Sequence, residues 1–298
     1  MNIVVVTGAT SMIGVATIKS CIDSGCEVIA LVRENNAKLS RLPDSEKITV
    51  VKCNLENLNK LDLNRNDCDV FYHFGWAYTD RLDREDINLQ LENIKFSLDA
   101  VDLAHRLGCK KFIGAGTQSE YGVCSDVIYP NVPVKPQNAY GIVKYAAGKL
   151  CEKRCEQLGI ISVWTRIFSV YGALINPDSV INYAISKFKA KEKAYFTSGT
   201  QIWNFLFEED CGVIFKLLGE KCDKSMVLCV ANKESRPLRD YIKDIADVIG
   251  DNVDYELAKE DHPGVVSLNP DVSLLYSITG FDSITPFKEG IRKIVKSN

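Results

Sequence analysis

The 298-residue chain lacks a long apolar run and lacks an excess of basic residues. A helix that crosses a membrane needs about 20 consecutive apolar residues, and the sequence contains no such stretch. The formal charge of −3 leaves no basic stripe of the kind that binds nucleic acid. The apolar run Ile3–Val6 is too short for a signal peptide and has no basic segment before it. We therefore expect a cytoplasmic protein without nucleic-acid or membrane partners.

Clustered cysteines are also missing, although the chain contains 11 of them. They are scattered between Cys21 and Cys229 without any Cys-x-x-Cys spacing, and their number is odd. Zinc sites need closely spaced ligands, and disulfide scaffolds are usually short chains. The pattern therefore predicts reduced, mostly buried thiols and no metal site.

The first residues, MNIVVVTGATSMIG, predict a strand, a tight turn and a helix. Ile3–Val6 is apolar throughout, as in a strand that is buried on both faces. Gly8, Ser11 and Gly14 stand where a dinucleotide-binding turn needs small residues beside the pyrophosphate. The N–H groups at the helix start would then face the phosphates. Ser11 in place of glycine meets this fingerprint only in part, and a purely structural connection is the alternative.

A second strand is predicted at 27–32, and a cation follows its carboxyl end. NAD enzymes commonly place a carboxylate there to bind the ribose 2′-hydroxyl, but this chain has Arg33. A guanidinium can hold a 2′-phosphate through two hydrogen bonds. Arg33 therefore favours NADP(H), while NAD(H) remains possible and a solvated surface arginine is the alternative.

The ends of further predicted strands bring aromatic and polar residues to the same edge of the sheet. Asn54 and Leu55 follow one strand, and the aromatic loop 74–78 follows the next. We expect both to line the cofactor crevice of an open α/β sheet. Trp76 either shapes a substrate pocket or packs, and His73 is interpreted as a hydrogen-bonding residue at a strand end. These strands are predicted at 48–51, 69–73 and 111–115. Apolar runs also predict strands at 202–207 and 226–230, and helical periodicity predicts a helix at 85–107.

Tyr140 and Lys144 stand four residues apart in a helix that is predicted after Asn138. They share one helical face, close enough for the ammonium to lower the pKa of the phenol and to hold the cofactor ribose. The spacing occurs by chance in many helices, so it needs support from other motifs. Thr117 follows the strand at 111–115, which is an active-site position in this type of sheet.

Taken together, these motifs resemble the extended short-chain dehydrogenase/reductase family along nearly the whole chain. The family contains NAD(P)-dependent nucleotide-sugar epimerases, dehydratases and reductases. The matching segments are TGATSMIG, Thr117 with Tyr121-Gly122, the Tyr140/Lys144 pair, 166–172 and 205–210. The resemblance implies an α/β fold, with a Rossmann-like doubly wound parallel sheet in residues 1–172. It also implies a smaller C-terminal α/β substrate lobe in residues 173–298, interleaved with the first domain.

The same resemblance implies roles for individual residues. Tyr140 would donate or accept the proton at the sugar oxygen, Lys144 would lower its pKa, and Thr117 would hydrogen-bond the same oxygen. Asn93 falls where the family has an asparagine that supports the lysine. Cofactor contacts are expected from Gly8, Thr10, Ser11, Met12, Ile13, Gly14, Arg33, Asn54, Leu55, Phe74, Gly75, Tyr140, Lys144 and Ile167. Substrate contacts are expected from Trp76, Thr117, Ser119, Tyr140, Ser169 and Trp203.

One departure from the family pattern argues against a dehydratase. Sugar-nucleotide dehydratases typically follow the threonine with an Asp-Glu pair that performs the elimination. Here Gln118 and Ser119 follow Thr117, and an amide and a hydroxyl cannot serve as that acid and base. Only a one-residue shift of the alignment to Glu120 would restore a carboxylate.

A second departure concerns the substrate diphosphate. Ser169 and Trp203 replace the asparagine and arginine that commonly bind it in the family, which puts the nucleotide handle in doubt. Four cations are candidates to substitute for them, although solvated surface charges are the simpler interpretation. These are Lys187, Lys189, Arg236 and Arg239.

We therefore predict NADP(H)-dependent reduction of the keto group of a nucleotide-activated sugar, with an NDP-4-keto-6-deoxyhexose favoured. Arg33 decides the direction, because a reductase draws on the NADPH pool whereas an epimerase cycles one tightly held NAD. A nucleotide-sugar 4-epimerase is the alternative enzyme, and a binding protein without chemistry is a third reading that the intact catalytic set opposes. The family also suggests a homodimer through helices near 91–103 and 140–158, although packing in a monomer explains the same apolar content.

Overall fold

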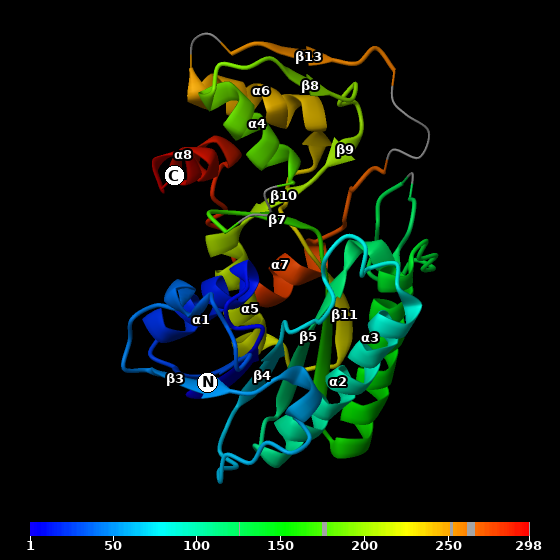
Figure 1. Cartoon of the computed structure of the whole chain (residues 1–298). Helices are drawn as coiled ribbons and strands as arrows, with labels where there is room; N and C mark the ends of the chain where they lie inside the picture. Colours follow the sequence, from blue (N-terminus) through cyan, green and yellow to red (C-terminus); the bar gives the residue numbers. More distant parts are fainter. Residues whose placement is uncertain (125, 175–177, 251–252, 261–265, 298) are drawn as a thin grey trace.

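A seven-stranded parallel sheet forms the centre of the computed structural model (Figure 1). The structure describes residues 1–124, 126–174, 178–250, 253–260 and 266–297. The strand order is β11-β6-β5-β4-β1-β2-β3, and every neighbouring pair is parallel. The strands are β1 (Ile3–Thr7), β2 (Glu27–Val32), β3 (Ile48–Lys52), β4 (Val70–His73), β5 (Lys111–Thr117), β6 (Ile161–Ile167) and β11 (Met226–Val230).

The strand order reverses at β1, because β2 and β3 lie on one side of it and β4, β5 and β6 on the other. In open α/β sheets such a reversal leaves a crevice outside the carboxyl ends of the strands, where ligands bind. The strands β1, β4 and β5 end there at Thr7, His73 and Thr117. The turns that follow these three residues form the candidate site.

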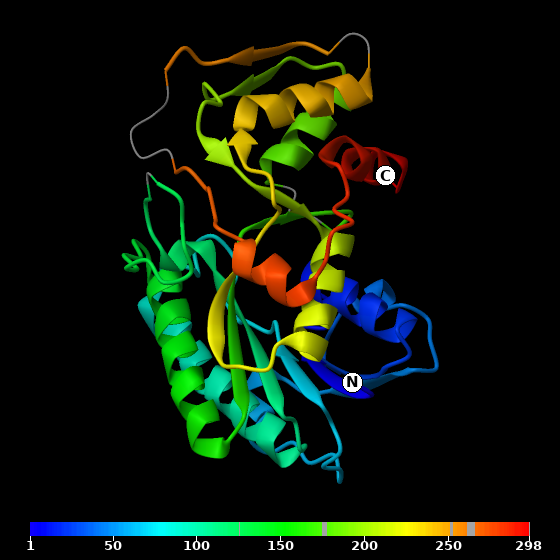
Figure 2. The same ribbon diagram turned by 180° about the vertical axis from the view of Figure 1, so that it is seen from behind.

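Helices cover both faces of the sheet (Figure 1, Figure 2). Successive strand residues point to opposite faces, so Val5 packs in one core cluster while Val4 and Val6 pack in the other. All three are fully buried, as expected for a strand that is covered on both sides. One face carries α1 (Met12–Asp23), α5 (Glu208–Lys221) and α7 (Ser273–Thr279), and the other carries α2 (Ile87–Arg106) and α3 (Ala139–Leu158).

A second group of elements lies beyond the carboxyl ends of the strands (Figure 1). It has its own core, in which the rings of Tyr171, Phe205, Tyr241 and Phe287 pack together. Its helices are α4 (Val180–Lys189), α6 (Leu238–Ile249) and α8 (Phe287–Ser297). Its paired short strands are β7 (Ser169–Tyr171) with β10 (Phe205–Phe207), β8 (Ala194–Phe196) with β13 (Tyr255–Leu257), and β9 (Ile202–Trp203) with β12 (Arg236–Pro237).

The fold-class prediction of a Rossmann-like parallel sheet with flanking helices is confirmed. The division at residue 172 stays a prediction, since α5 and β11 return from the second group of elements to the central sheet. All cysteines except Cys124 are buried, and each carries a free thiol. Within the described parts of the chain, no helix is long and apolar enough to cross a membrane.

The expectation of one strand over residues 202–207 is wrong. Trp203 pairs antiparallel with Arg236, whereas Phe205 pairs parallel with Ser169 in a different sheet. Asn204 stands between them and donates hydrogen bonds to the carbonyl oxygens of Asn232 and Glu234, at 2.8 and 2.9 Å. The hydrogen bonds of the buried Asn204 amide therefore stand where a continuous strand would pair. The chain passes at this residue from pairing with β12 to pairing with β7.

Candidate active site

The turn after β1 is tight enough to require glycine. Gly8 has a φ of +64°, and a Cβ there would lie 2.7 Å from the backbone nitrogen of Gly75. Ser11 caps α1, because its Oγ accepts the N–H of Gly14 at 3.0 Å. A Cβ on Gly14 would lie 2.4 Å from the carbonyl oxygen of Gly8. These three residues bring the helix start, with no acidic residue in its first turn, to the carboxyl end of β1.

A pocket of about 590 Å³ opens beside this turn. Its volume suits a dinucleotide or a similarly sized ligand. The pocket joins the turn to the segments that follow β2, β3 and β4. Eight of the predicted cofactor residues line it, namely Gly8, Thr10, Ser11, Arg33, Asn54, Leu55, Phe74 and Gly75. The predicted residues Met12, Ile13, Gly14, Tyr140, Lys144 and Ile167 are outside its lining.

The end of the pocket near β2 is more cationic than the sequence analysis predicted. Lys38 and Arg41 line it together with Arg33. A guanidinium nitrogen of Arg41 lies 3.4 Å from the carbonyl oxygen of Thr10, and Asn36 donates to the Thr10 hydroxyl at 3.0 Å. Two more cations within eight residues of Arg33 were the available signal, but sequence alone does not show that they fold back onto Thr10.

The structure brings Thr117, Tyr140 and Lys144 together at the carboxyl end of β5. Tyr140 lies in the first turn of α3, near enough to Thr117 that the Thr117 side chain acts to lower the pKa of the phenol. Lys144 lies one turn later, and its ammonium donates to the carbonyl oxygen of Ala115 at 2.7 Å. The N-cap Asn138 accepts the N–H of Gly141 at 2.8 Å, which fixes the start of the helix.

Burial and nearby charge perturb both titrating groups of this pair. Burial lowers the pKa of Lys144 to about 7, while the carboxylate of Glu120 opposes the shift. Burial also raises the pKa of Tyr140, against the influence of Arg84 and of the Thr117 hydroxyl. The guanidinium carbon of Arg84 lies 5.0 Å from the centre of the Tyr140 ring. Arg84 is therefore a cation of this site that the sequence analysis missed.

Trp76 connects the pocket to the catalytic pair. It lines the pocket, and the Lys144 ammonium lies 3.7 Å from the centre of its ring. Its indole also meets the Tyr140 ring edge to face, with centroids 6.1 Å apart, and donates to Gln90 at 3.0 Å. Asn93 holds the adjacent residue Ala77 through hydrogen bonds to its N–H and its carbonyl group. Asn93 thus supports the loop that places Trp76 against Lys144.

His73 is a structural residue at the end of β4, as expected. Its Nδ1 lies 2.8 Å from the hydroxyl of Thr7, and its Nε2 lies 3.3 Å from the hydroxyl of Ser97. Burial lowers the pKa of His73 to about 3, so the ring stays neutral at neutral pH. The Thr7 hydroxyl in turn accepts the N–H of Gly75 at 3.1 Å, so this network joins the ends of β1 and β4.

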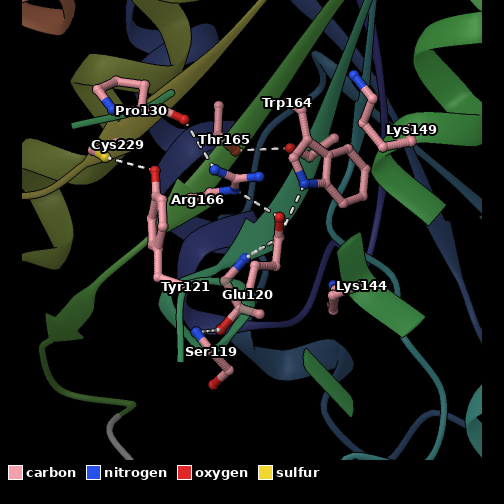
Figure 3. A network of polar contacts seen from close by, with 12 residues as sticks. Ser119, Glu120, Tyr121, Pro130, Lys144, Lys149, Trp164, Thr165, Arg166 and Cys229 are labelled. Atoms are coloured by element: carbon pink, nitrogen blue, oxygen red, sulfur yellow. Dashed lines mark hydrogen bonds and ion pairs between the residues drawn. The ribbon is translucent and has the colours of Figure 1, made fainter. Parts of the chain in front are cut away.

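Glu120 does not face the substrate side of the site. It is fully buried in the short 3-10 helix η3 (Gln118–Glu120). Its carboxylate accepts hydrogen bonds from the Thr117 N–H at 2.9 Å, the Trp164 indole at 3.0 Å and the Arg166 guanidinium at 2.7 Å (Figure 3). A carboxylate that is enclosed in this way cannot take the place of the dehydratase acid or base.

Ser169 and Trp203, which stand at the positions expected near the substrate diphosphate, hydrogen-bond to each other. The Trp203 indole donates to the Ser169 hydroxyl at 3.1 Å. Of the four candidate cations, three have internal partners and Arg239 is exposed. Lys187 pairs with Glu192, Lys189 donates to the carbonyl oxygen of Val295, and Arg236 pairs with Asp244. The first three are therefore engaged by groups of the protein itself, which does not favour a role for them at the diphosphate.

Comparison with known proteins agrees with this geometry. The family model described as NAD dependent epimerase/dehydratase family matches residues 4–228. The chain is 25% identical over 182 residues to the uncharacterized UDP-glucose epimerase YtcB of Bacillus subtilis (strain 168), a match covering 60% of this chain and 58% of the relative. It is 30% identical over 145 residues to dTDP-6-deoxy-L-talose 4-dehydrogenase (NAD(+)) of Aggregatibacter actinomycetemcomitans, covering 48% of this chain and 52% of the relative. The matches therefore span little more than half of each relative.

The fold is also similar to that of a solved enzyme. UDP-N-acetylglucosamine 4-epimerase from Methanobrevibacter ruminantium M1, in complex with UDP-N-acetylmuramic acid, superposes with a TM-score of 0.84 at 24% sequence identity. The superposition covers 99% of this chain and 97% of the epimerase chain. A likeness at this level of identity concerns the fold, and the sheet and the second group of elements are both included in it.

Proposed function

Because this chain belongs to the NAD-dependent epimerase/dehydratase family, the extended short-chain dehydrogenases/reductases, we propose that it reduces the keto group of a nucleotide-activated sugar with NADPH. The favoured substrate is an NDP-4-keto-6-deoxyhexose. The observation that carries the choice of a reductase is the cationic end of the pocket, where Arg33, Lys38 and Arg41 lie around the turn that would receive the cofactor.

The residues of the pocket fit an NADP(H) molecule. The glycine turn and the start of α1 offer backbone N–H groups to a pyrophosphate. Arg33, Lys38 and Arg41 offer charges to a 2′-phosphate, and guanidinium groups bind phosphate through two hydrogen bonds. When bound, the reduced nicotinamide supplies the hydride. The extra negative charge of the 2′-phosphate is what distinguishes NADPH from NADH at this end of the pocket.

Thr117, Tyr140 and Lys144 would carry the proton chemistry. The phenol of Tyr140 would donate its proton to the oxygen of the keto group, on which negative charge develops. The raised pKa of Tyr140 suits this donor role, because the phenol stays protonated at neutral pH. Thr117 would hydrogen-bond the same oxygen, and the Lys144 ammonium would stabilise the phenolate that remains. The oxygen therefore receives its proton as it becomes a hydroxyl group.

The 4-position of a 6-deoxy sugar is supported by one relative. The Aggregatibacter enzyme is named for the 4-dehydrogenation of dTDP-6-deoxy-L-talose, which is the reverse of a 4-keto reduction. The proposal transfers this substrate class to the present chain. Glu120 supports the choice against dehydratase chemistry, since its carboxylate is already held by Thr117, Trp164 and Arg166.

A nucleotide-sugar 4-epimerase is the alternative. The names of YtcB and of the Methanobrevibacter enzyme favour it. Tyr140, supported by Thr117 and Lys144, would then take the proton of a 4-hydroxyl group as C4 is oxidised. It would return that proton to the same oxygen when C4 is reduced from the opposite face of the sugar. An epimerase retains its cofactor and consumes no reductant, so cofactor turnover separates the two functions.

The experiment uses the purified chain with NADPH or NADH and a panel of nucleotide-linked 4-keto-6-deoxyhexoses. Loss of reduced-nicotinamide absorbance in proportion to the 4-hydroxy product is the expected result with NADPH. Tyr140→Phe serves as the matched control, because it removes only the phenolic oxygen. Isomerisation of a nucleotide sugar without any loss of NADPH would establish the epimerase and refute the reductase.

A further inference from the structure

Glu120 forms a buried polar junction beneath the catalytic threonine. It is 0% exposed, and Arg166 beside it is 4% exposed. One carboxylate oxygen accepts from Thr117 and Trp164, and the other accepts from Arg166 (Figure 3). Arg166 also donates to the carbonyl oxygen of Pro130 at 3.0 Å and stacks on the Tyr121 ring at 4.5 Å. A buried carboxylate with this many partners is held in a single orientation.

The junction fixes the backbone of Thr117. The Glu120 carboxylate accepts the Thr117 N–H, while the Thr117 hydroxyl accepts the N–H of Ser119 at 3.2 Å. These reciprocal bonds form a capping box at the start of η3. The same Thr117 hydroxyl meets the Tyr140 phenol. The rotamer of Thr117 that contacts Tyr140 therefore depends on Glu120.

The junction also sets how closely α3 approaches β5. The Trp164 indole fills a slot between β5 and α3, where a Cβ on Gly116 or on Gly148 would lie 2.4 or 2.6 Å from it. The N–H of that indole is held by Glu120 at 3.0 Å. Gly148 lies one helical turn after Lys144. The position of the indole therefore determines where α3 presents Lys144 to the end of β5.

The negative charge of the Glu120 carboxylate also lies close to the catalytic pair. The Lys144 ammonium binds the carbonyl oxygen of Ala115, and the Glu120 carboxylate lies against the next residue, Gly116. Glu120 raises the pKa of Lys144 and of Tyr140 against the effects of burial and of Arg84 respectively. The other titratable groups around the junction and the pair are His73, Arg166, Tyr121, Tyr145, Lys149, Cys151, Glu152 and Cys229.

We propose that Glu120 is a positioning residue for the catalytic pair. Its carboxylate, held by Trp164 and Arg166, sets the conformation of Thr117 and keeps a negative charge beside Lys144. Glu120 makes no contact with the substrate, since it is fully enclosed. The inference rests on the proposed function only in that the pair it serves transfers a proton during reduction.

Two variants that remove charges of opposite sign test the proposal. Glu120→Gln keeps the shape of the side chain but removes the negative charge and leaves Arg166 uncompensated, so the pKa values of Lys144 and Tyr140 should fall. Reduction needs both groups protonated, and the basic limb of kcat against pH should therefore move to lower pH. Arg166→Gln leaves the carboxylate uncompensated, and the limb should move to higher pH. Below the basic limb, where Lys144 keeps its charge, we expect Glu120→Gln to lower kcat by about tenfold or more, with the KM for NADPH nearly unchanged.

A purely structural role for Glu120 predicts a different result. Both variants would then lose folded protein and turnover together, and the pH limb would stay in place. That outcome would overturn the proposal. If neither variant folds, as judged by circular dichroism, Trp164→Phe decides the question because it keeps both charges while it removes the indole N–H that Glu120 accepts and leaves a smaller ring. A several-fold lower kcat with unchanged KM for NADPH would support the proposal, and wild-type kcat would contradict it.

A measurement without turnover separates this inference from the proposed function. The pKa of Lys144 is measured by NMR on protein that carries isotope-labelled lysine, with the resonance assigned by its loss in Lys144→Arg. A lower pKa in Glu120→Gln than in the wild type supports the inference, even if no sugar is reduced. An unchanged pKa refutes it, even if the protein proves to be a reductase.

Discussion

At the scale of single residues, Tyr140 and Lys144 illustrate how one turn of helix separates two tasks. The Tyr140 phenol meets the hydroxyl of Thr117, whereas the Lys144 ammonium lies between the carbonyl oxygen of Ala115 and the ring of Trp76. The phenol is placed for proton transfer, and the ammonium is placed to supply charge and to bind a neighbouring group. Substitution of each should therefore have a different effect.

Tyr140→Phe should lower turnover by about two to four orders of magnitude and leave NADPH affinity nearly unchanged, because it removes only the proton donor. Lys144→Ala should weaken both turnover and NADPH binding, since it removes the charge that would hold the cofactor ribose. Steady-state kinetics and a fluorescence titration with NADPH measure the two effects. Near-wild-type turnover in Tyr140→Phe would show that another group supplies the proton.

Arg33→Asp should shift cofactor preference from NADPH towards NADH. A carboxylate at this position repels the 2′-phosphate and can bind a ribose 2′-hydroxyl instead. We expect the ratio of kcat/KM values for NADPH and NADH to fall by about ten- to a hundredfold, or ~1.4–2.8 kcal/mol. Arg292→Asp on the exposed side of α8 makes the same charge change away from the pocket and serves as the control. An unchanged ratio in Arg33→Asp would mean that Lys38 and Arg41 suffice or that the 2′-phosphate lies elsewhere.

Among the secondary-structure elements, β5, β6 and α3 pack closely because glycines leave room between them. The Trp164 indole of β6 occupies space that a Cβ on Gly114, Gly116 or Gly148 would take, with distances of 2.4–2.6 Å to its atoms. Three glycines on two neighbouring elements therefore form one slot for one large ring. Such close packing tolerates little added volume.

Gly148→Ala should destabilise the fold by about 1–3 kcal/mol, although alanine has the higher helix propensity. The added methyl group would lie 2.6 Å from the Trp164 ring. Urea unfolding followed by circular dichroism gives the change in the free energy of unfolding. The double variant with Trp164→Phe should recover part of the loss, because the smaller ring makes room, and such coupling is expected between contacting residues. A stabilised Gly148→Ala would show that the ring moves aside at no cost.

At the scale of the whole molecule, α2 and α3 pack against each other and leave large apolar side chains exposed on their outer faces. Leu91 is 49% exposed and Leu150 is 44% exposed. Ile87 on α2 and Ile142 on α3 are exposed by more than half. Exposed apolar groups on two neighbouring helices are typical of a surface that pairs with a second copy of the chain.

We predict a homodimer through this surface of α2 and α3. The double variant Leu91→Lys with Leu150→Lys should be monomeric, because paired interfaces would bring the added charges together. Size-exclusion chromatography with light scattering measures the mass of each protein. Leu274→Lys, at a 45% exposed residue of α7, introduces the same change elsewhere and should leave the dimer intact. A monomeric wild type at micromolar concentration would contradict the prediction.

Local patterns in the sequence were sufficient for most of the sheet and for the main motifs. Ile3–Thr7 and Met226–Val230 form strands close to the predicted ranges, and α2 begins and ends within two residues of its predicted limits. The prediction failed at residues 202–207, where apolar residues are continuous but Asn204 divides them between two sheets. Periodicity identifies a strand but not the strand with which it pairs. Here residues 202–203 and 205–207 pair with different strands, so they form two strands and not one.

Local sequence patterns were enough to predict the alternating strands and helices, the glycine turn at Gly8 and the shared face of Tyr140 and Lys144, because each depends on neighbours within a few residues. Three contacts could be known only from the folded chain: Arg41 with Thr10, Trp76 with Lys144, and Glu120 with Trp164 and Arg166. These contacts join residues up to 68 positions apart, as between Trp76 and Lys144. They depend on the order of the strands and on the closeness of helix to sheet, which no local pattern specifies.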